Sequence, residues 1–229
     1  MLNEELDIRK NTSYSPKPND TWMMDCPKNS HLGIQGWENH IWQNFSYTYN
    51  EDGFRTKFPY PDTDIIAVGD SFTEHHGGPE EEQWTQHVGK PVINLGMDGA
   101  GNDTIADIVE WGVNKFNPKT VLVMFSYLHR YNENGKFKAD DTNHKRCQER
   151  MLFNFNRIVE CTKGLNFIYS FIPDKLIIRE DNWADIDWLD NNFPKRLKIV
   201  TDKWDYGRDG HHFGPDAVRL IGYNFGRLV

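Results

Sequence analysis

The sequence predicts a three-layer α/β/α sandwich on a mainly parallel, five-stranded sheet, preceded by an irregular N-terminal extension with a β-hairpin. Three observations support this prediction. Short apolar runs recur from residue 63 onward, segments with helical periodicity separate them, and residues 1–62 lack both patterns. Strands that alternate with helices are joined by right-handed crossovers, which produce a parallel sheet covered on both faces. The predicted units are therefore an extension, 1–62, packed on a main domain, 63–229.

The extension contains one recognisable element. Residues 46–56 alternate aromatic and polar side chains around the sequence Asn50-Glu-Asp-Gly53. Asp-Gly is a frequent turn dipeptide, and alternation is typical of a strand with one buried face. This segment is therefore predicted to be the β-hairpin.

The main domain holds five candidate strands and three candidate helices. Short apolar runs of this kind are typical of buried parallel strands. They lie at 65–68, 91–95, 120–125, 165–172 and 197–200. Apolar residues at helical spacing lie at 105–116, 147–158 and 218–228. Asn102 is a candidate cap for the first helix, Gly164 for the end of the second, and Pro215 is placed to open the third.

Composition and charge exclude several classes of protein. The 229 residues include 26 Lys and Arg against 34 Asp and Glu, a net charge of −8, which argues against a non-specific nucleic-acid binder. An aromatic content of 14% argues against a disordered chain. We find no secretory signal and no run approaching the roughly 18 apolar residues of a membrane span. Three cysteines outside any CxxC spacing suit a reducing compartment, so the expected location is the cytoplasm, or a host's cytoplasm for a viral gene.

Chemically active residue types follow the first two predicted strands. Ser71, in Gly69-Asp70-Ser71, lies where strand turns to helix, with its backbone N–H at the positive helix end. That position suits a nucleophile whose attack creates an oxyanion. A helix-capping serine is the simpler interpretation of the tripeptide alone. The loop at 94–103 has glycines at positions 96, 99 and 101, whose N–H groups could approach a ligand closely. A tight loop without a ligand is the alternative.

A carboxylate and an imidazole lie close together before the last predicted helix. Asp209 and His212 are spaced so that both can share one turn. An aspartate can then fix the histidine tautomer while the other ring nitrogen takes a proton from a serine. His211 is a rival base. No HxxxH or HExxH spacing accompanies the His-His pairs, so no metal and no other cofactor is expected.

In these motifs the chain resembles the GDSL-type, or SGNH, hydrolases, a family of esterases and acyltransferases. The matching residues are Gly69-Asp70-Ser71, Gly99, Asp209 and His212, and residues 49–55 and 82–84 also look like segments of some members. The resemblance spans about 46–229. It implies a flavodoxin-like sheet, a triad of Ser71, His212 and Asp209, and an oxyanion hole made by the N–H groups of Ser71 and Gly99 and an asparagine side chain.

The asparagine is where the sequence departs from the family. Members usually carry it just after the third strand, where this chain has Leu128 or His129. Asn102, beside Gly99, could replace it as a donor or could cap the following helix, and His129 or Arg130 could serve instead. Loss of one such donor costs roughly 10²–10³ in rate.

The resemblance implies a serine esterase acting on short-chain acyl esters, with O-acetylated carbohydrate as one substrate class. An O-acyltransferase that modifies a glycan with the same triad is the second hypothesis. A catalytically weak binding or structural module is the third, because the usual asparagine is missing. The expected partner is thus a small acyl ester or an acylated carbohydrate, with no nucleic acid and no membrane span. The sequence carries no signal for an oligomeric state.

Overall fold

The centre of the protein is a parallel sheet. The computed structural model describes residues 9–14, 46–133, 136–139, 143–172, 186–199 and 212–229. In the described residues the sheet has four strands in the order β4-β3-β5-β8, and every neighbouring pair is parallel. The strands are β3 (Ile65–Gly69), β4 (Ile93–Gly96), β5 (Thr120–Phe125) and β8 (Asn166–Phe171). Their carboxyl ends therefore share one edge, where loops from several strands can meet.

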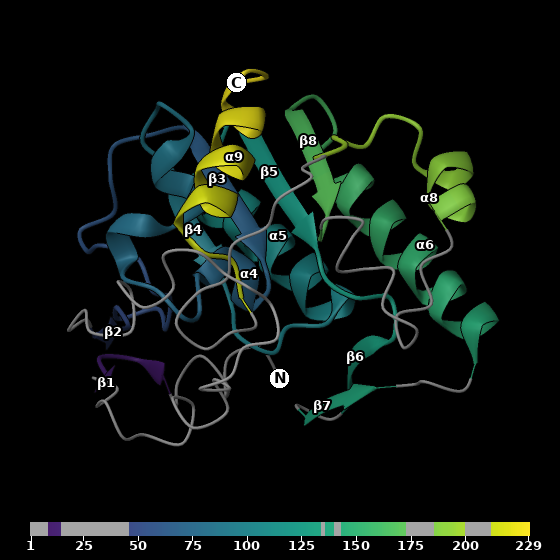
Figure 1. Ribbon diagram of the computed structural model, residues 1–229, viewed down its shortest axis with the longest axis horizontal. Coiled ribbons are helices and arrows are strands. Elements are labelled where there is room, and N and C mark those ends of the chain that lie inside the picture. The colour runs from purple at the N-terminus through teal and green to yellow at the C-terminus, as the bar shows by residue number, and fades with distance from the viewer. Residues whose placement is uncertain (1–8, 15–45, 134–135, 140–142, 173–185, 200–211) are drawn as a thin grey trace.

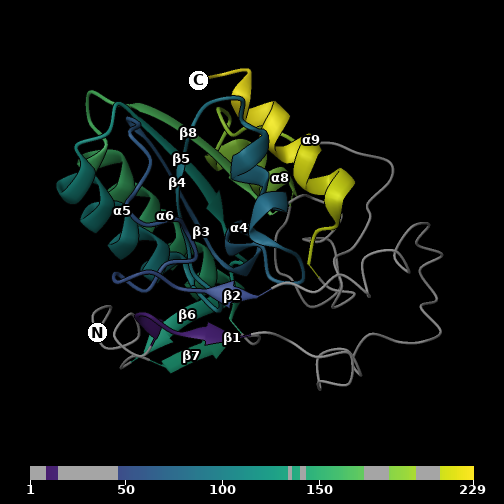
Figure 2. The same ribbon diagram turned by 90° about the vertical axis from the view of Figure 1, so that its left-hand side faces the viewer.

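Helices cover both faces of this sheet (Figure 1). On one face lie α5 (Asn102–Phe116) and α6 (His144–Cys161), and on the other lie α8 (Ile186–Asn192) and α9 (Pro215–Gly226), as Figure 2 shows. Three short helices connect β3 to β4: α4 (Ser71–Glu74), η1 (Glu80–Glu82) and η2 (Trp84–His87). The prediction of an α/β/α sandwich with a mainly parallel sheet is confirmed.

The strands are apolar because both of their faces are covered. β3, β4 and β5 are buried along their whole length, so they lack the polar alternation of a half-exposed strand. On the α9 side, the indole of Trp84 stacks on Phe225 with ring centroids 4.7 Å apart. Val218 and Ile221 of α9 are buried as well, and burying one large apolar side chain contributes roughly 1.5–3 kcal/mol.

The helix boundaries agree with the sequence except at the caps. Gly214 precedes α9 and Pro215 is its first residue, as predicted. Gly101 is the N-cap of α5, so Asn102 is already inside the helix and is not its cap. The C-cap of α6 is Thr162, whose hydroxyl donates to the carbonyl of Ile158 at 2.7 Å. The prediction of Gly164 as the cap was therefore wrong by two residues.

The predicted fifth strand at 197–200 does not form within the described residues, and Val200 lies outside them. Leu197 nevertheless lies against the edge of β8. Its N–H donates to the carbonyl of Tyr169 at 2.7 Å, and the hydroxyl of Ser170 donates to its carbonyl at 2.9 Å. One of these two bonds comes from a side chain instead of the backbone. The apolar run therefore contacts the edge of the sheet without forming a strand.

The predicted hairpin at 46–56 forms its turn but not its strand pair. The N–H of Asn50 donates to the carbonyl of Phe54 at 2.9 Å, which closes the turn. The strand β2 (Tyr47–Thr48) instead pairs antiparallel with β1 (Ser13–Tyr14). Phe54 is fully buried in the hydrophobic core, so the second arm turns inward rather than back along the first.

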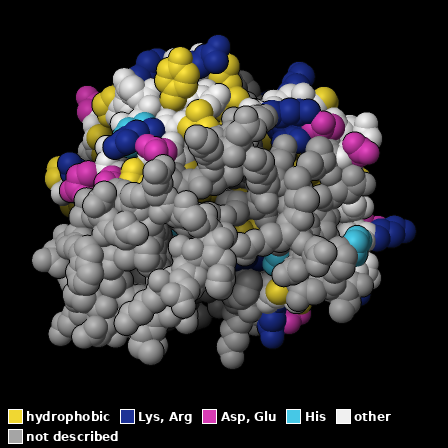
Figure 3. Space-filling model, viewed as in Figure 1, with side chains coloured by type: hydrophobic (Ala, Val, Ile, Leu, Met, Phe, Trp, Pro, Cys, Tyr) yellow, Lys and Arg dark blue, Asp and Glu magenta, His cyan; other side chains and the backbone are white. Residues whose placement is uncertain are grey.

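A second small sheet, β6 (Arg130–Glu133) with β7 (Lys136–Ala139), was not predicted. Its strands are polar and carry no apolar run, so only the pairing itself reveals them. Both small sheets lie toward the carboxyl ends of the parallel strands (Figure 1). No helix in the described part of the chain is long and apolar enough to cross a membrane. On the face in Figure 3, positive and negative side chains are interspersed over the described surface.

Candidate active site

The turn between β3 and α4 holds the predicted nucleophile. Asp70 is the N-cap of α4, and its carboxylate accepts from the N–H of Phe72 at 3.0 Å. A Cβ on Gly69 would lie 2.1 Å from the hydroxyl of Thr73 and 2.9 Å from the carbonyl oxygen of Met124, so only glycine fits there. The strand therefore turns directly into a helix, with Ser71 at its first position.

Ser71 and His212, 141 residues apart in the sequence, are in contact. The Nε2 atom of His212 lies 2.8 Å from Oγ of Ser71. Serine can donate to Nε2 only when the ring proton is on Nδ1, the tautomer that a general base requires. The ring of Phe72 lies 4.7 Å from that of His212 and 4.6 Å from that of Phe213, which holds the segment before α9 against α4.

Two residues of this predicted site lie outside the described residues. They are Asp209, the predicted partner of the histidine, and His211, the rival base. The role of Asp209 therefore stays a prediction.

The backbone at Gly99 has the freedom that an anion-binding loop needs. Gly99 follows β4 with φ of 74°, a left-handed conformation that favours glycine. Neither its N–H nor that of Ser71 donates to another group among the described residues. Ser71 is also in the first turn of a helix, where N–H groups have no intrahelical acceptor. The described residues supply no acceptor for either N–H group, and their role as oxyanion donors stays a prediction.

Asn102 ties the start of α5 to the loop after β5. Its amide oxygen accepts from the N–H of Ser126 at 2.9 Å, and its amide nitrogen donates to the carbonyls of Ser126 and Tyr127 at 3.2 and 3.3 Å. The side chain is buried, with 3% of the residue exposed. These contacts direct the amide group of Asn102 toward the loop after β5.

The other candidates for the missing donor follow β5. Leu128 is buried and apolar. The ring of His129 stacks on that of Tyr127, with centroids 5.6 Å apart. Nη1 of Arg130 lies 3.4 Å from a carboxylate oxygen of Asp70, and its guanidinium lies 4.7 Å from the Tyr127 ring centroid. Arg130 therefore approaches the residue next to the nucleophile.

Asp70 is completely buried beside Ser71. Besides the N–H of Phe72, it accepts from the hydroxyl of Ser126 at 2.6 Å. Burial raises the pKa of the carboxyl group, and the charge of Arg130 and the hydrogen bond from Ser126 only partly oppose this. Asp70 therefore links the end of β3 to the end of β5 and stabilises the turn that carries Ser71.

A buried carboxylate on α4, not singled out from the sequence, links the extension to the Gly99 loop. Glu74 is fully buried and forms an ion pair with Arg9. It also accepts from the hydroxyl of Tyr49 at 2.7 Å and from the N–H of Asp98 at 2.6 Å. Burial and the charge of Glu74 raise the pKa of Tyr49, which keeps its hydroxyl a donor. One carboxylate thereby connects three segments around the site.

Arg55, in the segment that resembles some family members, holds the loop after α4. Its guanidinium donates to the carbonyls of His75 at 2.6 Å and Gly78 at 2.7 Å, and lies 4.0 Å from the Tyr47 ring centroid. The hydroxyl of Tyr47 in turn accepts from the N–H of Gly77 at 2.8 Å. The extension therefore frames the loop that carries the nucleophile.

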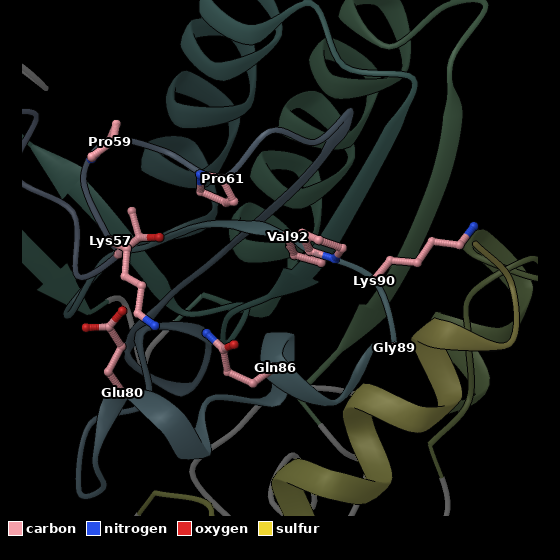
Figure 4. A pocket seen from close by; sticks show the side chains of 10 residues that line it. Lys57, Pro59, Pro61, Glu80, Gln86, Gly89, Lys90 and Val92 are labelled. Carbon is pink, nitrogen blue, oxygen red and sulfur yellow. The ribbon is translucent and has the colours of Figure 1, made fainter.

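Two of the cavities in the described part of the protein differ in size and lining. One of about 480 Å³ is lined by Lys57, Glu80 and Lys90 among others and includes neither Ser71 nor His212 (Figure 4). A smaller one, about 230 Å³, lies between the start of α5, the segment after β5 and α6; its lining includes Asn102 and Arg130 but, again, neither Ser71 nor His212. The described residues contain no group of three metal-binding side chains.

Comparison with solved structures identifies the fold. A protein from Desulfitobacterium hafniense assigned to the G-D-S-L lipolytic family superposes with a TM-score of 0.52, at 17% identity over 72% of this chain and 98% of that one. A family 2 carbohydrate esterase of Corynascus thermopiles (Myceliophthora fergusii) gives 0.51, at 13% identity over 80% and 69%. A family two carbohydrate esterase of Clostridium thermocellum, solved with cellohexaose, gives 0.52, at 10% identity over 73% and 63%.

The chain therefore has the fold of the GDSL-type hydrolases, at low sequence identity. No protein-family model matches the sequence, and no curated protein sequence matches it either. Likeness of fold does not by itself define an activity, because function depends on the site.

Proposed function

We propose that this protein is a serine esterase that hydrolyses short-chain acyl esters. The observation that carries the proposal is the 2.8 Å contact between Ser71 Oγ and His212 Nε2, at the carboxyl edge of a sheet with the GDSL-type fold. A serine in that contact can lose its proton to the imidazole as it attacks.

The proposed reaction has two halves. In the first, His212 Nε2 takes the proton of Ser71 while Oγ bonds to the ester carbonyl carbon, and the N–H groups of Ser71 and Gly99 stabilise the oxyanion. The ester C–O bond then breaks, and His212 returns the proton to the departing alcohol. In the second half, water attacks the acyl-serine by the same route. Asp209 is proposed to hold the Nδ1 proton of His212.

We propose that Asn102 acts on this site indirectly, by holding the loop after β5. Its hydrogen bonds to Ser126 and Tyr127 support the loop that carries Arg130, and Ser126 in turn bonds to Asp70. The two backbone N–H groups are then the main oxyanion donors.

The proposed substrate class is an O-acetylated carbohydrate. Two of the similar structures are carbohydrate esterases, and Arg130 and Asn132 bring hydrogen-bonding groups to the smaller cavity, which suit the hydroxyls of a sugar.

The test is hydrolysis of p-nitrophenyl acetate and of an acetylated oligosaccharide. Ser71→Ala and His212→Ala should each lower kcat/KM by at least ~10³, as removal of a triad member does. Ser46→Ala, an exposed serine of the extension, is the matched control and should leave the rate unchanged. Equal activity in wild type and Ser71→Ala, with both folded, would sink the assignment.

Acyl transfer to a glycan is the alternative enzymatic proposal, because the extension that frames the nucleophile loop resembles members that act on polysaccharides. The separating experiment supplies an acyl donor with and without a glycan acceptor. Transfer predicts an acylated glycan that disappears in Ser71→Ala, whereas hydrolysis alone sends all of the acyl group to water.

A binding module is the remaining alternative. Rapid labelling of Ser71 by a fluorophosphonate would contradict it, and failure to label would support it over both enzymatic proposals.

A further inference from the structure

His76, on the loop after α4, lies flat against His212. The two imidazole rings are stacked, with centroids 5.2 Å apart and planes inclined by 19°. The ring of Tyr47 packs on His76 with centroids 5.2 Å apart. His76 therefore occupies the space between the extension and the imidazole that contacts Ser71.

Asp98 completes a second histidine–carboxylate pair. Its carboxylate oxygen lies 3.6 Å from Nδ1 of His76, an ion-pair distance. Asp98 directly precedes Gly99, and its own N–H is held by the buried carboxylate of Glu74. The pair thus joins the Gly99 loop to the face of His212.

Several charged or titratable groups of the described residues act on this pair and on His212. His212 acts electrostatically on the carboxylates of Asp70 and Asp98, and the ring of His76 stacks on its imidazole. The guanidinium of Arg55 lies over the ring of Tyr47, and the charge of Arg9 acts on Asp98. The Asp98 side chain is half exposed, and its partial desolvation opposes ionisation; His76, His212 and Arg9 outweigh this and lower its pKa to about 2.

We propose that His76 and Asp98 are positioning residues that hold the ring of His212 and set its proton affinity. The proposal goes beyond the esterase assignment but rests on it, because His212 must be the base for its proton affinity to govern a rate. Stacking restricts the ring to the plane in which Nε2 meets Ser71 Oγ. The charges act on the imidazolium that forms during the reaction.

The two members of the pair act in opposite directions. The carboxylate of Asp98 stabilises a protonated His212, so its removal should lower the pKa of His212. A protonated His76 repels a protonated His212 and also screens it from Asp98. Replacing His76 by an uncharged ring should therefore raise the pKa of His212. A purely structural role would weaken activity in both variants without opposite shifts.

The experiment is an NMR titration of His212 in protein labelled at histidine, with the pH profile of kcat/KM for p-nitrophenyl acetate alongside it. Asp98→Asn should move the pKa of His212 and the acid limb of the profile down by roughly 0.5 pH unit, the size expected for a partly exposed charge pair. His76→Phe keeps a stacked ring and should move both up by a similar amount. His76→Gln, which removes the ring and the charge, should also move them up, with a further loss in kcat.

Asp64→Asn is the matched control, because it removes the same charge at the amino end of β3. It should shift neither quantity. No shift in folded Asp98→Asn and His76→Phe, or shifts in the same direction, would overturn the proposal. His76→Gln and Asp98→Ser provide the same two readings if a first variant does not fold. The titration reports on His212 whether or not the protein hydrolyses esters, so an inactive wild type would overturn the esterase proposal alone.

Discussion

The two loops that meet at Ser71 are supported from different parts of the chain. The nucleophile segment, residues 70–78, is held by residues that precede the parallel sheet in the sequence: Arg55 binds its carbonyls, and Tyr47 and Tyr49 bind Gly77 and Glu74. The loop after β5, residues 126–129, is held by Asn102 at the start of α5 and by Asp70.

The difference identifies what the extension does. Buried carbonyls and N–H groups need partners, and a sharp turn such as 70–78 cannot satisfy all of its own. Residues 47–55 supply those partners, so this part of the extension belongs to the framework of the site. The loop after β5 needs no such help because a side chain on α5 reaches it directly.

The largest destabilisation of residues 70–78 is expected from Arg55→Ala. The carbonyls of His75 and Gly78 would lose charge-assisted partners in a buried site, so we expect a loss of about 3 kcal/mol in the free energy of unfolding. Urea denaturation measures it, with esterase activity falling in parallel. Arg219→Ala is the control, because its exposed ion pair is worth less than ~0.5 kcal/mol. A loss equal to that of the control would mean that the extension does not support the loop.

The matching change in the second loop is Asn102→Ala, with an expected loss of about 2 kcal/mol, because neutral hydrogen bonds to Ser126 and Tyr127 are lost. Urea denaturation and steady-state kinetics together decide its role. A fall of roughly 10²–10³ in kcat at unchanged stability would instead make Asn102 an oxyanion donor.

A smaller effect is expected from Tyr47→Phe. The variant keeps the ring that contacts His76 and Arg55 but removes the acceptor for the N–H of Gly77, at a cost of about 1 kcal/mol. The control is Tyr223→Phe, an exposed tyrosine of α9. If both lose the same free energy in urea, the hydroxyl of Tyr47 does not support the loop.

The smallest effect is expected from Asp70→Asn, and it is measured as a change in how the free energy of unfolding depends on pH. The folded protein raises the pKa of Asp70 above its usual 3.8, so the native state binds more protons than the unfolded chain. The wild type should therefore lose stability, relative to this variant, as pH rises from about 4 through the raised pKa. Urea denaturation from about pH 3.5 to 8 measures the difference. A wild type that gains on the variant over that range would contradict the assignment.

Several elements could be predicted because their information is local. The strand at 120–125 was predicted to the residue, since an unbroken run of buried apolar side chains needs no partner to be recognised. Pro215 likewise marked the start of α9. Ser71 and His212 could be chosen because each follows a strand or precedes a helix in a motif with a known chemical use.

Other features depended on partners far away in the sequence. Strand β2 pairs with residues 13 and 14 rather than with its own hairpin arm, and 197–199 meets β8 by a single backbone bond. Backbone hydrogen bonds between such distant segments leave no periodic pattern in either sequence. The five-strand count therefore exceeded what the described residues form.

The sequence by itself determined the layered fold and the two residues now 2.8 Å apart, because apolar periodicity and short motifs act over a few neighbouring positions. Only the tertiary structure decided that Asn102 braces a loop, that Glu74 and Arg55 connect the extension to the site, and that His76 and Asp98 lie against His212. Those contacts join segments up to 136 residues apart, counted from 76 to 212, and are selected by which buried polar groups need partners.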